Sequence, residues 1–160
     1  MITVEQYIEW MKRPDWTILT DPDQHDCENS AGEYWYTDNL YAKTPYGIII
    51  VDSGRRINGA SIPWYCQGII PKSGKWNRPA GTHDPGYEDG GWWVIDLNRA
   101  SGRRFVPLTQ KQIDKGYLKF MKSRKVKKWI RKAQYRMLRM FGWVTWNKYK
   151  NDRIKNKEGK

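Results

Sequence analysis

The residues best suited to chemistry lie in the segment THDPGY (residues 82–87), followed later in the chain by Asp114. If the segment is helical, His83 and Tyr87 share one face, while Asp84 points about 100° away. Histidine can act as a general base near neutral pH. We therefore expect a catalytic site in which His83 is the base and Asp84 holds a water or a cation. In that site Tyr87 orients a second carboxylate, for which Asp114 is the candidate.

One histidine and two aspartates can also bind a divalent metal ion through one nitrogen and two oxygens, which leaves coordination positions open to water and substrate. Asp84 is the candidate metal ligand. A structural interpretation competes with both: His83 pins a helix, Asp84 accepts backbone hydrogen bonds, and Tyr87 fills the core. The HDxxY pattern alone does not decide between these interpretations.

A second segment of interest is NGASIP (residues 58–63), about 20 residues before the histidine. Its small residues allow the backbone to approach another group closely, and Pro63 makes the bend rigid. Ser61 is a candidate nucleophile, although no GxSxG turn surrounds it. We expect a tight bend beside the site and treat Ser61 as its weakest catalytic candidate.

Charge is concentrated at one end of the chain. The net charge is +12, and residues 119–160 hold 16 Lys and Arg against two acids, a balance of +14 that leaves −2 for residues 1–118. Such a segment is attracted to nucleic acid, anionic lipid or acidic protein, and it can equally be a solvated face that keeps a protein in solution. The candidate polyanion-binding residues are Lys128, Lys132, Arg136 and Arg139.

The helices that would position these residues have local signals. Thr3 and Gln6 resemble a capping box, and Thr109 is a good N-cap. Pro85 is expected to kink or end the helix that carries His83, and Gly142 to end the last helix. The apolar spacing predicts helices over residues 4–12, 78–88, 110–121 and 126–141.

Aromatic and β-branched runs predict strands over residues 33–42, 48–51 and 92–97, with a turn at residues 44–47. The acidic loop at residues 21–32 is expected on the surface. Trp10 and Trp129 lie on apolar helical stripes and are expected in the core. Residues 147–160 are nearly free of apolar side chains, so we expect an extended or frayed basic tail.

Together these elements predict an α+β fold, with a small antiparallel sheet or hairpin in the N-terminal half packed against C-terminal helices. We expect one domain over residues 1–146, followed by the tail. The longest apolar run is about four residues, whereas a membrane-spanning helix needs roughly 20. The sequence begins without the apolar stretch of a signal peptide, and Cys27 and Cys66 fit neither a disulfide framework nor a zinc site. These features predict a cytoplasmic protein with free thiols.

The order of segments resembles a family of uncharacterised phage and prophage proteins, domain of unknown function thirteen fifty-three. The resemblance covers roughly residues 45–146. Asn58 stands where the family usually has Asp, and Pro85 with Gly86 replaces a better helical pair. The family motifs fall here on Ala60, Ser61, Pro63, His83, Asp84, Tyr87, Asp114, Phe141 and Gly142.

This resemblance implies a phage origin, and with it a location in the host cytoplasm or in a virion, but no particular activity. A looser similarity is to secreted phospholipases of the A-two type, which also use His-Asp-x-x-Tyr and a later Asp, but this chain has neither their glycine-rich calcium loop nor their many cysteines. Three functions stay open. The first is a small hydrolase or hydrolase-like protein built on His83, Asp84 and Asp114, with or without a divalent metal. The others are a non-enzymatic virion, tail or ejected internal component that binds other phage structural proteins, and a nucleic-acid binder.

Overall fold

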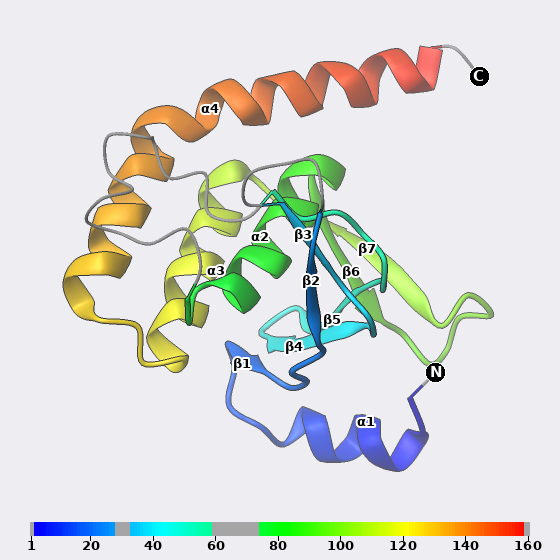
Figure 1. The fold of residues 1–160 in the computed structure, drawn as a ribbon. Helices are drawn as coiled ribbons and strands as arrows, with labels where there is room; N and C mark the ends of the chain where they lie inside the picture. Colours follow the sequence, from blue (N-terminus) through cyan, green and yellow to red (C-terminus); the bar gives the residue numbers. More distant parts are fainter. Residues whose placement is uncertain (1, 28–32, 59–73, 159–160) are drawn as a thin grey trace.

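The computed structural model describes residues 2–27, 33–58 and 74–158. Its centre is a five-stranded antiparallel sheet in the order β1-β4-β5-β6-β7, with a two-stranded sheet, β2-β3, beside it (Figure 1). The expected α+β class is confirmed, although the last two strands of the main sheet follow α2 in the chain. The strands are β1 (Thr17–Ile18), β2 (Gln24–Asp26), β3 (Tyr34–Tyr36), β4 (Leu40–Thr44), β5 (Gly47–Val51), β6 (Gly91–Ile95) and β7 (Arg103–Pro107). The helices are α1 (Val4–Met11), α2 (Asn77–Asp89), α3 (Gln110–Ser123) and α4 (Lys128–Glu158).

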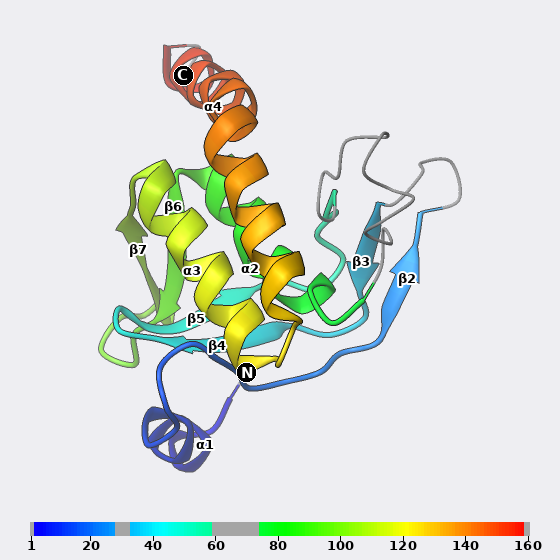
Figure 2. The same cartoon turned by 90° about the vertical axis from the view of Figure 1, so that its left-hand side faces the viewer.

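Both faces of the main sheet are covered, because alternate residues along a strand point to opposite sides. Ala42 and Ile49, which are register partners, belong to the cluster that includes Tyr87 of α2 and Ile113 of α3. The neighbouring residue Ile48 belongs instead to the cluster into which α1 packs. Figure 2 shows α2, α3 and α4 together on one side of the sheet and α1 apart from them. The three helices on one side carry the candidate site.

Local signals set the starts of two helices as expected. Thr3 with Gln6 and Thr109 with Gln112 both form complete capping boxes, at α1 and α3 respectively. The expected turn at residues 44–47 joins β4 to β5. These signals act over a few residues, so the sequence shows them directly.

The helix that carries His83 does not end at Pro85. α2 continues to Asp89 and ends at Gly90, whose φ of 77° is the left-handed conformation that glycine adopts easily. Gly86 permits the close approach of α2 to the sheet, because a Cβ there would lie 2.7 Å from Nε1 of Trp92. Pro85 is therefore accommodated inside α2, and Gly86 serves the close packing of this helix against the sheet.

The expectation for the C-terminal region was wrong. Gly142 lies inside α4, and residues 147–158 continue the helix. A Cβ at position 142 would lie 2.7 Å from Oη of Tyr87, so this glycine serves close packing and does not end the helix. Trp146 and Tyr149 pack against the main core, which holds the supposed tail to the body. Figure 1 shows that α4 changes direction part-way along its length.

Other expectations also need correction. The strand expected over residues 33–42 is divided into β3 and the start of β4, and part of the loop expected over residues 21–32 forms β2. β7 was not anticipated. Trp129, expected in the core, is half exposed, whereas Trp10 packs on the ring of Tyr41.

Among the described residues, no helix combines the length and apolar character needed to cross a membrane. Cys27 is a free thiol, and Cys66 lies outside the described residues.

Candidate functional site

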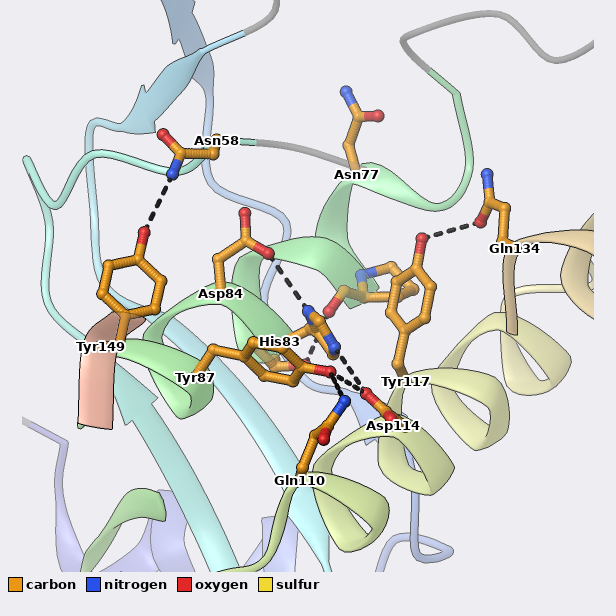
Figure 3. Close-up of polar contacts among 12 residues, drawn as sticks. Asn58, Asn77, His83, Asp84, Tyr87, Gln110, Asp114, Tyr117, Gln134 and Tyr149 are labelled. Atoms are coloured by element: carbon orange, nitrogen blue, oxygen red, sulfur yellow. Dashed lines mark hydrogen bonds and ion pairs between the residues drawn. The ribbon is translucent and has the colours of Figure 1, made fainter. Parts of the chain in front are cut away.

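His83 lies between two aspartates at the contact of α2 with α3. Its Nδ1 is 3.2 Å from Oδ1 of Asp84, and its Nε2 is 3.2 Å from Oδ1 of Asp114 (Figure 3). The rings of Tyr87 and Tyr117 pack near the imidazole, with centroids 4.3 and 5.1 Å from that of His83. His83 is only 5% exposed. The imidazole is thus fixed in place and both of its nitrogens face carboxylates.

Asp114 is the centre of this arrangement. It is fully buried and comes from the second turn of α3. Oη of Tyr87 donates to its Oδ1 at 2.5 Å, and Nη1 of Arg139, from α4, donates to its Oδ2 at 2.6 Å. Gln110 in turn donates to the hydroxyl of Tyr87 at 3.2 Å. A buried carboxylate requires such a set of donors, because an uncompensated charge in the interior is strongly destabilising.

The neighbouring charges decide the protonation of the two central groups. Burial lowers the pKa of His83, but the hydrogen bonds and charges of Asp114 and Asp84 outweigh burial and leave the pKa raised. Burial raises the pKa of Asp114, but His83, Tyr87 and Arg139 together leave it lowered. Burial and the adjacent carboxylate also raise the pKa of the Tyr87 hydroxyl. Near neutral pH the network therefore favours an ionised Asp114 beside an imidazole with strong proton affinity.

Charge alternates along the network, from Asp84 through His83 and Asp114 to Arg139. This pattern ties α2, α3 and α4 together, and it is also the arrangement in which a carboxylate orients a histidine base and stabilises the imidazolium that forms when the base accepts a proton. Arg139 is the more accessible end of this network, with 37% of its side chain exposed. On the Nδ1 side of His83, Asp84 is the more accessible group, with 15% of its side chain exposed compared with 6% for His83. Solvent and substrate would therefore reach Nδ1 past Asp84.

The set of His83, Asp84 and Asp114 does not surround a common point, because the imidazole ring lies between the two carboxylates (Figure 3). Within the described parts of the chain, no group of three or more histidine, cysteine, aspartate or glutamate side chains is arranged to hold a metal ion. The expected ligand set of one nitrogen and two oxygens is not formed there. Asp84 as a metal ligand stays a prediction.

The structure brings together His83, Asp84, Tyr87 and Asp114, the four residues singled out around the HDxxY motif. Ser61 lies outside the described residues. Lys128, Lys132 and Arg136 are exposed as expected for a cationic strip. Arg139 differs, because its guanidinium turns inward to Asp114.

Two members of the network were missed as members of the site. Arg139 was counted with the surface cations, and Gln110 was treated only as the start of a helix. No sequence signal marks either role, since both depend on how α4 and α3 meet. A further polar pair, Tyr117 donating to Gln134 at 2.8 Å, joins α3 to α4 next to the imidazole.

Comparison with known proteins identifies a family and nothing more. The family model described as Protein of unknown function (DUF1353) matches residues 36–138. The chain belongs to this family. The matched part of this chain contains His83, Asp84, Tyr87 and Asp114, and it ends one residue before Arg139. No curated protein and no solved structure matches the chain.

Proposed function

We propose that this protein is a small hydrolase in which His83 is the general base and Asp114 orients it. The observation that carries the proposal is the contact of Nε2 with a buried carboxylate that is itself held by Tyr87 and Arg139. A fixed carboxylate on one ring nitrogen determines which nitrogen exchanges protons with a substrate. That nitrogen is Nδ1, on the side of Asp84.

The proposed reaction uses one water molecule. Nδ1 of His83 takes a proton from the water while the water oxygen forms a bond to the electrophilic centre of the substrate. Asp114 stabilises the resulting imidazolium. The bond to the leaving group then breaks, and Nδ1 returns the proton to the leaving group. Asp84, which lies 3.2 Å from Nδ1, has to turn aside to admit the water. Its carboxylate is then available to hold the water or a cation.

This proposal leaves the substrate open, because a general base can activate water for attack on esters, amides or phosphodiesters alike. The phage origin rests on the family resemblance. The non-enzymatic alternative, a virion, tail or ejected component that binds acidic partners or DNA, drew on the basic C-terminal region. The chain's own core holds the described part of that region, because Trp146 and Tyr149 pack into it. The order of residues 147–158 therefore does not call for a partner, and no observation favours this alternative over the hydrolase.

The test is a hydrolysis survey of purified protein, with and without divalent cations, on an activated carboxylic ester, a phosphodiester, phospholipid vesicles, peptidoglycan and nucleotides. His83→Gln is compared with His25→Gln, which changes the only other histidine in the sequence. His25 is exposed and stacks on Trp35, outside the network. We expect turnover that falls about 100-fold or more in His83→Gln and is unchanged in His25→Gln. Equal turnover in both variants, or none by the wild-type protein on any substrate, would contradict the proposal.

A further inference from the structure

A hollow of about 470 Å³ lies between the start of α3 and the part of α4 from Arg139 to Arg153. Among the described residues that line it, four carry a positive charge and none carries a negative charge. The four are Lys111, Arg139, Lys150 and Arg153. They come from two helices and converge on one open space, unlike the exposed cations that follow one helix face at Lys128, Lys132 and Arg136.

Two of the four cations, Arg139 and Arg153, donate hydrogen bonds to acceptors of the protein itself. Nη1 of Arg139 donates to Asp114, and Nη1 of Arg153 donates to the carbonyls of Tyr87 and Glu88 at 2.7 and 2.8 Å. A guanidinium has five N–H donors, so both groups keep donors for a second partner. These contacts fix the direction of each guanidinium, and fixed donors lose less freedom when they bind a ligand.

The other two cations have no acidic partner in the described structure. Lys111 and Lys150 are exposed, and neither forms an ion pair with a described carboxylate. Their charges add to that of Arg153 around the same hollow, where like charges repel one another, while the charge of Arg139 is balanced by Asp114. A ligand that carries negative charge relieves this repulsion.

We infer that this hollow binds the phosphate group of a small phosphorylated ligand. Phosphate carries up to two negative charges and offers oxygens in several directions, which matches lysine and arginine donors that approach from two helices. Trp146 also lines the hollow, and its ring centroid lies 5.2 Å from the guanidinium carbon of Arg153. Its ring offers an aromatic surface for an organic part of the ligand. The hollow shares Arg139 with the network of the proposed hydrolase but does not include His83, and its ligand goes beyond the proposed function.

The experiment measures binding to the full-length protein by calorimetry, with no turnover required. The probes are inorganic phosphate, glycerol phosphate and adenosine monophosphate, with adenosine as the uncharged comparison. The test variant combines Lys111→Gln with Lys150→Gln. Its matched control combines Lys128→Gln with Lys132→Gln, which removes the same charge from two exposed positions in the first turns of α4. All four lysines are exposed, so both variants should unfold at the wild-type temperature.

We expect saturable binding of one phosphorylated probe per chain, weakened at least tenfold by the test variant and unchanged in the control. Tighter binding of adenosine monophosphate than of glycerol phosphate would assign the aromatic surface to a base, and the reverse order would assign the hollow to a phosphate without one. No saturable binding, or equal weakening by both variants, would overturn the inference, because equal weakening is general attraction to a basic protein. Because binding is measured without hydrolysis, this result is independent of whether His83 is catalytic.

Discussion

Replacing Asp114 with Asn removes one negative charge from a fully buried position and preserves the shape of the side chain. In the native protein its two oxygens accept from His83, Tyr87 and Arg139. Asparagine offers one carbonyl oxygen, and its amide nitrogen is itself a donor. At least one of the three donors therefore faces another donor and loses its partner.

The size of the effect follows from the partners that remain. The loss of a hydrogen bond to a charged group costs about 1.5–3 kcal/mol, and leaving one member of a buried ion pair alone costs about 3–5 kcal/mol. The side chain of Arg139 is 37% exposed and can turn to water, so its share is that of an exposed pair, about 1 kcal/mol or less. His83 has no such exit. We expect the free energy of unfolding near neutral pH to fall by about 3 kcal/mol in Asp114→Asn.

Urea unfolding followed by tryptophan fluorescence measures this change directly. Asp152→Asn is the matched control, because it makes the same chemical change at an exposed position of α4 and should alter the free energy of unfolding by no more than about 0.5 kcal/mol. A loss of less than about 1 kcal/mol in Asp114→Asn would refute the reasoning, since it would mean that the buried network contributes no more than an ordinary hydrogen bond.

The remaining predictions also concern stability. The raised pKa of His83 contributes stability that is fully present below about pH 6.5 and is lost as the pH rises through the pKa in the folded protein. The lowered pKa of Asp114 contributes stability that is present above about pH 3.9 and is lost as the pH falls through the pKa in the folded protein. Chemical denaturation across pH should therefore find the highest stability between these limits, with a smaller alkaline loss in His83→Gln. Gly142→Ala, which would stabilise an open helix by about 1 kcal/mol, should here lower the free energy of unfolding by about 1–3 kcal/mol because its methyl group meets Tyr87; a stabilised variant would show that the two helices can separate. Arg153→Gln should cost about 1–2 kcal/mol because two carbonyls at the end of α2 lose their donor, and an unchanged urea midpoint would contradict that role.

What the sequence predicts well here depends on short-range signals. The capping boxes at Thr3 and Thr109 start helices where expected, since donor and acceptor are three residues apart. The four-residue spacing of His83 and Tyr87 predicted that both lie on one face of a helix, and Tyr87 contacts Asp114, the carboxylate that it was expected to orient. That His83 contacts the same carboxylate is seen only in the structure.

What the sequence did not predict depends on how distant elements meet. Gly142 was expected to end a helix because glycine often does, but here it lets α4 pass close to Tyr87, a contact no local pattern shows. Arg139 was grouped with solvated cations by its helical position, yet the approach of α4 to α3 brings it to Asp114. The tail was expected to fray on composition alone, whereas two of its side chains, Tyr149 and Arg153, together with Trp146 just before it, contact the body and hold it there.

The central claim is that His83, oriented by Asp114, accepts the proton in the reaction. The most direct test compares the pH dependence of kcat/KM on the best substrate of the survey with the NMR titration of the His83 ring, in the wild-type protein and in Asp114→Asn. We predict that the rate rises with pH at the pKa of His83 in the titration, above the ordinary histidine value, and that both pKa values move downward together in Asp114→Asn. A rate profile that stays in place while the titration of His83 moves would contradict the claim.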